Sequence, residues 1–185
     1  MAPRSETRDR LLQTAAGLFQ EQGYSATGLN QVLSVGRAPK GSMYFHFPGG
    51  KEQLGAEAVA LSGASLGERL GEVVRAAPDA VSGLAALGEF FARTLEESEF
   101  RKGCPVATTA LEAAADSEPI RAACDGAYAA WQGGLAAALG RWGVAEPEAL
   151  AAVVLSSLQG ALVLARVRRD ASVIRTCMEQ LGRLV

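Results

Sequence analysis

Histidine is almost absent from this chain: His46 is the only one among 185 residues. A cysteine nucleophile would have to take that ring as its base, and a zinc site would have no second imidazole. Cysteine is also scarce, and Cys104, Cys124 and Cys177 form an odd set without a C-x-x-C pair. We therefore expect no catalytic residue, no metal and no cofactor, and a reducing, cytoplasmic location.

The sequence also lacks a hydrophobic run of membrane-spanning length. Its first residues, MAPRSETRDRLLQTAA, contain no apolar core of the kind that a signal peptide needs. The apolar run at 151–165 is shorter than the roughly 20 residues that cross a bilayer, and Arg166, Arg168 and Arg169 close it. We expect no membrane association and interpret the run as a buried helix.

Aromatic residues are few, at 6% of the chain, and β-branched residues are sparse, whereas Ala and Gly are abundant. The seven prolines mostly fall between stretches of apolar periodicity rather than inside them. This composition favours helices over sheets. The length and the 49% hydrophobic content are enough for two folding units at most. We predict an all-α protein.

Acidic and basic residues are unevenly distributed along the chain. The formal net charge is −2, but residues 1–51 carry +3 and the remainder carries −5. A positive N-terminal segment on an acidic body suits phosphate contact at one end. A solvated charged face with no such partner is an equally good interpretation of the charge alone.

Apolar spacing predicts three short helices in the first 47 residues. The first has one apolar face and ends at Gly23. Thr27 is the expected N-cap of a second helix over 28–35. A third is expected to run from Pro39 to Phe47 and to bury Met43 and Phe47. The inward residues of the first helix are Leu11, Leu12, Ala15, Leu18 and Phe19.

Further helices are expected along the rest of the chain. They cover about 51–76, 79–97, 106–115, 119–141, 147–169 and 171–184. The first of them is long enough to connect two modules rigidly. The architecture that we predict is an N-terminal three-helix domain joined by this long helix to a C-terminal helical domain.

The helices at 28–35 and 39–47, joined at Gly36-Arg37-Ala38, have the dimensions of a helix-turn-helix. In the second of them, Lys40 supplies a cation, and Gly41 removes a side chain so that backbone N–H groups can approach a phosphate. Ser42 and Tyr44 add hydroxyl donors. These groups are suited to phosphate contact and limited base reading.

The run K-G-S-M-Y-F-H-F-P-G-G-K-E-Q-L at 40–54 resembles the DNA-binding domain of TetR-family regulators, and the resemblance extends over residues 5–65. The family pattern, K-G-(S/T)-(L/M)-Y-x-(H/Y)-F followed by Lys, is matched from Lys40 to Lys51. The Pro-Gly-Gly linker, the downstream stretch 103–106 and Leu111-Glu112 resemble the LmrA/YxaF branch. The family usually has Gly where this chain has Arg37, so either the turn takes another form or Arg37 contacts a phosphate.

The resemblance implies a DNA-binding domain over 1–50, extending to about 65 with helix four, and a ligand-binding and dimerisation domain over 51–185. It also implies a repressor released from its operator by a small, largely apolar effector. For Tyr44 and His46, packing inside the three-helix core is the alternative. The expected DNA-binding residues are Thr27, Arg37, Lys40, Gly41, Ser42, Tyr44, His46 and Lys51.

In the C-terminal half, aromatic surface combined with a few polar groups indicates a small-molecule pocket, with ordinary core as the alternative for each residue. The expected pocket residues are Phe90, Phe91, Thr94, Cys104, Thr108, Leu111, Tyr128 and Trp131. The last two helices are expected to form a four-helix homodimer interface, or else to close the monomer core. The expected interface residues are Leu155, Leu158, Leu162, Ala165, Ile174, Cys177 and Leu181.

Three other functions are weighed against regulation of transcription. An enzyme with Cys104 as nucleophile is disfavoured because His46 lies in the predicted DNA-binding helix. A helical interaction module would explain the small residues of the helix at 147–169, but not the basic N-terminal helices. A thiol-based sensor without a small-molecule ligand is the remaining alternative.

Overall fold

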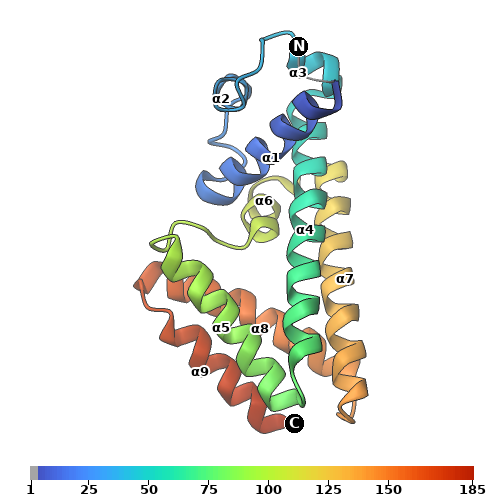
Figure 1. Cartoon of the computed structure of the whole chain (residues 1–185), viewed down its shortest axis with the longest axis vertical. Coiled ribbons are helices and arrows are strands. Elements are labelled where there is room, and N and C mark those ends of the chain that lie inside the picture. The colour runs from blue at the N-terminus through green and yellow to red at the C-terminus, as the bar shows by residue number, and fades with distance from the viewer. Residues whose placement is uncertain (1–3) are drawn as a thin grey trace. The chain divides into compact units, whose positions relative to one another are not determined.

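The computed structural model describes residues 4–185, which form nine α-helices and a final 3₁₀ turn (Figure 1). The described residues contain no strand, which confirms the predicted all-α fold class. The first three residues of the predicted DNA-binding domain lie outside the described residues. The helices are α1 (Arg4–Gln22), α2 (Leu29–Val35), α3 (Ser42–His46), α4 (Gly50–Ala76), α5 (Ala80–Glu97), α6 (Pro105–Ala113), α7 (Glu118–Arg141), α8 (Pro147–Arg168) and α9 (Ser172–Leu181), followed by the 3₁₀ turn Gly182–Leu184.

Two compact units make up the fold. The first contains the chain up to Ala64 together with Pro105–Ala127, and the second contains Ser65–Cys104 together with Tyr128–Val185. The helices α4 and α7 therefore contribute one part to each unit, and α6 belongs to the N-terminal one. The predicted boundary at residue 50 separates a DNA-binding from a ligand-binding domain, whereas the two units are defined by compactness alone. The predicted boundary therefore stays a prediction.

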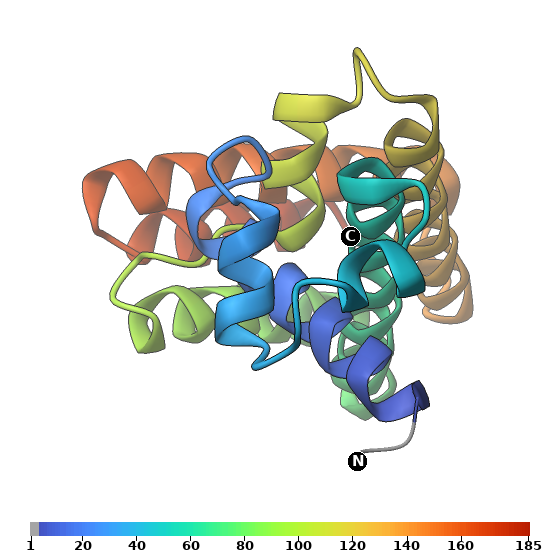
Figure 2. The ribbon, with the colours of Figure 1, turned by 90° about the horizontal axis from the view of Figure 1, so that it is seen from above.

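The core of the first unit is formed by apolar side chains from α1 to α4. Figure 2 shows these four helices from above. Leu11, Ala15 and Phe19 of α1 are at most 2% exposed, as the helical spacing predicts, and Leu12 is also buried. Leu18 is only partly buried and packs at the edge of this cluster. The core members are Leu11, Leu12, Ala15, Phe19, Val32, Leu33, Met43, Phe47, Leu54 and Ala58.

Two predicted helix starts in this unit are wrong. Gly28, not Thr27, is the N-cap of α2, because the Thr27 hydroxyl is directed back to the carbonyl of Gly23. The third helix begins at Ser42 rather than Pro39, because residues 39–42 form a turn in which Ser42 N–H donates to the Pro39 oxygen at 2.9 Å. The end of α1 is as predicted, with Gly23 at a φ of 88°.

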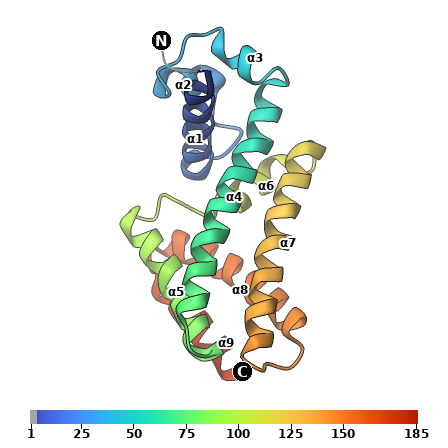
Figure 3. The same cartoon turned by 45° about the vertical axis from the view of Figure 1, so that its right-hand side comes forward.

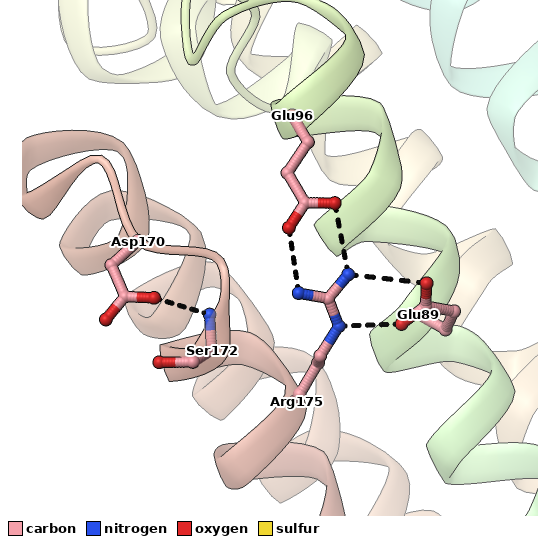
Figure 4. Close-up of polar contacts among 5 residues, drawn as sticks. All are labelled: Glu89, Glu96, Asp170, Ser172 and Arg175. Carbon is pink, nitrogen blue, oxygen red and sulfur yellow. Dashed lines mark hydrogen bonds and ion pairs between the residues drawn. The ribbon is translucent and has the colours of Figure 1, made fainter.

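The second unit is organised around α5, which packs along α9 and also contacts α8 (Figures 1 and 3). Gly88 allows the close approach of α5 and α9, since a Cβ there would lie 2.9 Å from the Cβ of Met178. On the surface, the Arg175 guanidinium joins the two helices by hydrogen bonds to Glu89 and Glu96, at 2.7 and 2.8 Å (Figure 4). These bonds lower the pKa of both carboxyl groups.

By length and composition alone, α8 could cross a membrane, and 33% of its most apolar window is buried. The helix extends from Pro147 to Arg168, which confirms the helix predicted over about 147–169; the apolar run of 151–165 lies inside it. The core helices of water-soluble proteins meet the same criterion. One face of α8 packs on α9, and the opposite face exposes apolar side chains.

Candidate nucleic-acid interface

Helix α3 has one buried face and one exposed face. Met43 and Phe47 are 1% and 0% exposed, which confirms that these i and i+4 positions face the core. Tyr44 is 67% exposed, so its phenol does not plug the three-helix core. His46 is intermediate in exposure, and its ring meets Phe47 at 6.5 Å between centroids.

The turn between α2 and α3 is a Schellman motif. The backbone N–H groups of Arg37 and Ala38 donate to the carbonyls of Ser34 and Leu33, at 3.2 and 2.9 Å. Arg37 occupies the position of this motif that needs a positive φ, and its φ is 50°.

The glycine before it, Gly36, serves close packing instead. A Cβ on Gly36 would lie 2.9 Å from a methyl carbon of Leu11, and its φ is an ordinary −73°. Arg10 of α1 adds a hydrogen bond from Nε to the Gly36 oxygen, at 2.8 Å. The left-handed residue of this turn is thus Arg37, whose side chain is exposed.

Two of the expected DNA-binding residues are engaged within the first unit. Thr27 is 1% exposed, and its hydroxyl donates to the Gly23 oxygen at 2.7 Å and accepts from Gln22 at 3.0 Å. The Lys51 ammonium donates to the Ser25 oxygen at 3.3 Å and lies 4.5 Å from the centre of the Tyr24 ring. Burial lowers the pKa of Lys51, although Glu112 opposes that shift.

Glu112, at the end of α6, holds the loop that precedes α2. Its carboxylate accepts the backbone N–H of Ser25 at 2.6 Å. It also approaches Gly23 so closely that a Cβ there would lie 2.2 Å from Oε1. The sequence does not predict this contact, because residues 25 and 112 are far apart in the chain. Glu112 was noted there only as part of the likeness to the LmrA/YxaF branch.

The remaining expected residues are accessible. Lys40 and Gly41 are exposed, and Ser42 is partly exposed. Among residues 4–185, only the chain neighbours of Gly41 come within 4 Å of the place where its Cβ would be. Together with Arg37 and Tyr44, they give α3 and its preceding turn a surface of two cations, two hydroxyls and open backbone. Such groups bind phosphates and base edges.

The comparisons with known proteins agree with this geometry. Residues 11–58 match the model of bacterial regulatory proteins of the tetR family, and residues 80–180 match the C-terminal domain of LmrA/YxaF-like transcriptional regulators. The chain belongs to the TetR family. It is therefore a transcriptional regulator with a DNA-binding helix-turn-helix, and it lies in the LmrA/YxaF-like branch.

Individual relatives support this membership. The HTH-type transcriptional regulator YxaF of Bacillus subtilis is 36% identical over 100% of this chain and 98% of its own. The regulator LmrA of the same organism is 36% identical over 90% of each chain. A TetR-family regulator from Agrobacterium tumefaciens shares the fold, with a TM-score of 0.87 over 99% of each chain at 19% identity. These relatives are named as regulators and not as enzymes.

The expected effector-pocket residues fall in both units. In the second unit, Phe91 and Trp131 are buried and form edge-to-face pairs with Phe90 and Tyr128, at 5.2 and 5.5 Å between centroids. Cys104 is also buried there, and the Thr94 hydroxyl donates to the Phe90 oxygen at 2.8 Å.

Thr108 and Leu111 belong to the first unit. Leu111 is 84% exposed, so its side chain faces solvent rather than the interior of that unit. A polar group that sequence reasoning missed lies in the second unit: Gln159 Nε2 is buried without a hydrogen-bond partner among the described residues. An amide at one helical position carries no sequence signal that would mark it.

Most of the residues expected at the dimer interface are buried within the protomer. This group consists of Leu158, Leu162, Ala165, Ile174 and Leu181. Their burial is consistent with the packing of α8 and α9 on each other, which leaves Leu155 and Cys177 intermediate. None of the large apolar residues that α8 exposes was among the predicted interface residues. They are Val153, Val163, Leu164 and Val167.

The three cysteines are thiols rather than disulfides. Cys104 and Cys124 are buried, and burial raises the pKa of the partly covered Cys177. A raised pKa lowers the thiolate fraction and hence the reactivity of Cys177. This environment does not favour the thiol-sensor alternative at that residue.

Proposed function

We propose that this TetR-family regulator is a cytoplasmic homodimeric repressor that lays α3 in the major groove of its operator and leaves it when a small molecule binds. The observation that carries the proposal is the division of α3 into two faces. Met43 and Phe47 hold the helix on its core, while Tyr44 and Lys40 are exposed. A helix anchored in this way presents its outer face to a groove.

Each outward group has a role in this arrangement. Arg37 and Lys40 meet phosphates, and the open backbone at Gly41 lets N–H groups approach them. Tyr44 and Ser42 donate from their hydroxyl groups. His46 and Lys51 are only partly exposed, and Thr27 is left out because its hydroxyl is already bonded inside the unit.

The outer face of α8 supports dimerisation. Val153, Gly160 and Val167 are exposed and spaced by seven residues, with Val163 and Leu164 between the last two. Apart from the backbone of α8 itself, no atom of the described residues lies within 4 Å of the place where a Gly160 Cβ would be, so another helix has room to approach closely. An aliphatic heptad stripe with a central glycine suits packing against the same helix of a second copy, related by a two-fold axis.

The second unit supports a small, largely apolar effector. The edge-to-face pairs on α5 and α7 offer aromatic surface, and the buried amide of Gln159 offers a donor that has no partner in the part of the chain that the structure describes. Buried donors in native proteins normally have a partner, so this one suits an effector with a hydrogen-bond acceptor. To release DNA, that effector must bind the DNA-incompatible state more tightly.

A DNA titration tests the proposal. The purified protein is titrated onto a fluorescent duplex from upstream of its own gene and onto a shuffled duplex, at several salt concentrations. We expect preference for the upstream duplex and a steep fall of affinity with salt. Lys40→Ala should reduce the salt slope by about one for each phosphate that the variant no longer binds. Equal binding of both duplexes, or an unchanged slope, would count against the proposal.

The effector is tested by release from DNA. Candidate aromatic compounds are added to the complex, and compounds that dissociate it are titrated against the Gln159→Leu variant. We expect weaker release from that variant because its donor is gone. A compound that saturates the protein without changing its affinity for DNA is rejected as the effector.

A further inference from the structure

Helix α3, which we propose to lie in the major groove, exposes the apolar ring of Phe45. The DNA contacts proposed above do not involve this ring. Phe45 is 60% exposed, although a phenylalanine is ordinarily a core residue. It occupies the one position of the motif at 40–47 that the TetR pattern leaves open, so the resemblance assigns it no role.

Folding of the first unit does not need this ring in the core. The inward positions of α3 are filled by Met43 and Phe47, both almost completely buried. The Phe45 ring lies instead against His46, edge to face, with 4.9 Å between centroids and 81° between planes. The ring is still 60% exposed in this arrangement.

The chemistry of the ring determines what it recognises in a major groove. Phenylalanine has no hydrogen-bond donor or acceptor, whereas phosphates and most base edges require one. The apolar group that a major groove offers is the C5-methyl group of thymine. Adenine and guanine present polar atoms instead, which lose their water without compensation, and cytosine has only a hydrogen at C5 beside its polar amino group.

We propose that Phe45 is a specificity-determining residue that selects thymine in each half of the operator through the C5-methyl group. The inference rests on the proposed DNA-binding role of α3. It adds a base preference that the phosphate-binding residues do not supply.

The first experiment is a selection from a random duplex library with the full-length protein, its Phe45→Ala variant and Leu111→Ala. The last variant is the matched control, since it truncates a residue that is 84% exposed on α6. We expect the wild type and the control to enrich sites with an invariant thymine in each half-site. Phe45→Ala should enrich related sites in which that position accepts other bases.

The second experiment removes the methyl group from the DNA. Deoxyuridine replaces the selected thymine, and binding is measured for wild type and Phe45→Ala. The wild type should lose about fourfold in affinity per substituted half-site, as expected for one buried methyl group. The variant should bind both duplexes equally. Circular dichroism and thermal melting of both proteins verify that the exposed substitution leaves the fold intact.

The outcomes distinguish this inference from the proposed function. If the wild type enriches no sequence, DNA reading by α3 itself is refuted. If both proteins enrich the same thymine, or uracil weakens them equally, the role of Phe45 is refuted while the repressor proposal stands. A uniform loss of affinity for all sequences with Phe45→Ala would likewise overturn base selection by this residue.

Discussion

The helices α3 and α8 both expose large apolar side chains, but the chemistry around those side chains differs. On α3 the exposed residues are the aromatics Tyr44 and Phe45, preceded by the accessible cation Lys40. On α8 they are aliphatic, as at Val163 and Val167, and the exposed Gly160 lies among them. Aromatic rings beside cations suit a nucleic acid, whereas aliphatic rows beside glycine suit another helix. Exposure alone therefore does not identify a partner; the neighbouring groups do.

The largest expected effect concerns the inner face of α8. Leu158 is 4% exposed and belongs to the protomer core, so Leu158→Ala should lower the free energy of unfolding by about 2–5 kcal/mol. Denaturant unfolding at fixed protein concentration measures it. Sedimentation under native conditions should still show a dimer. A monomeric variant with nearly unchanged stability would place Leu158 at the interface, where the sequence predicts it.

The outer face should respond in the opposite way. Val163→Glu places a charge on the exposed stripe and should yield a folded monomer whose operator affinity falls about 100-fold, because two half-sites are no longer bound together. Analytical ultracentrifugation and DNA titration measure the two effects. Leu111→Glu is the control, since it adds the same charge at an exposed leucine outside α8. A dimeric Val163→Glu protein would exclude this stripe as the interface.

On α3, removal of one hydroxyl group gives a smaller effect. Tyr44→Phe should weaken operator binding by about 1 kcal/mol per protomer, as expected for the removal of one hydrogen bond, and should leave the dimer unchanged. Tyr24→Phe is the matched control, because its ring lies under Lys51 rather than on α3. Fluorescence anisotropy compares the three proteins. Equal affinities of wild type and Tyr44→Phe would remove the phenol from the recognition surface.

The smallest expected effect is a gain in stability at the turn before α3. Arg37→Gly relieves a left-handed conformation and should raise the free energy of unfolding by up to about 1 kcal/mol while weakening DNA binding. Arg169→Gly relieves the same kind of conformation, at a φ of 52°, at the end of α8. It should stabilise the protein without affecting DNA affinity. Weaker DNA binding by Arg169→Gly, or unchanged binding by Arg37→Gly, would contradict this assignment.

The same comparison shows what the sequence could predict. On α3, Met43 and Phe47 are four positions apart and their neighbours are polar or exposed, so the buried face follows from the spacing. On α8 apolar residues occur nearly all round the helix, and no periodicity distinguishes Leu158, which is buried, from Val163, which is exposed. The inner face of α8 therefore became clear only from its packing on α9.

Backbone hydrogen bonds account for the other differences. Threonine is a common N-cap residue, but the hydroxyl of Thr27 donates to the Gly23 oxygen just after α1. Gly28 is therefore the N-cap of α2. In the turn before α3, Arg37 takes the left-handed position where the family usually has glycine, whereas Gly36 packs on Leu11. The contact of Glu112 with Ser25 joins residues 87 positions apart, beyond the reach of local patterns.

Placement of α3 in the major groove is the central claim, and a methylation footprint of the operator tests it directly. Dimethyl sulfate modifies guanine N7 in the major groove and adenine N3 in the minor groove. We expect the protein to protect guanine N7 in two half-sites spaced by whole turns of about 10 base pairs, and adenine N3 between them to stay reactive. Protection confined to adenine N3, or guanine protection that persists when Lys40 and Tyr44 are both replaced by Ala, would contradict that placement.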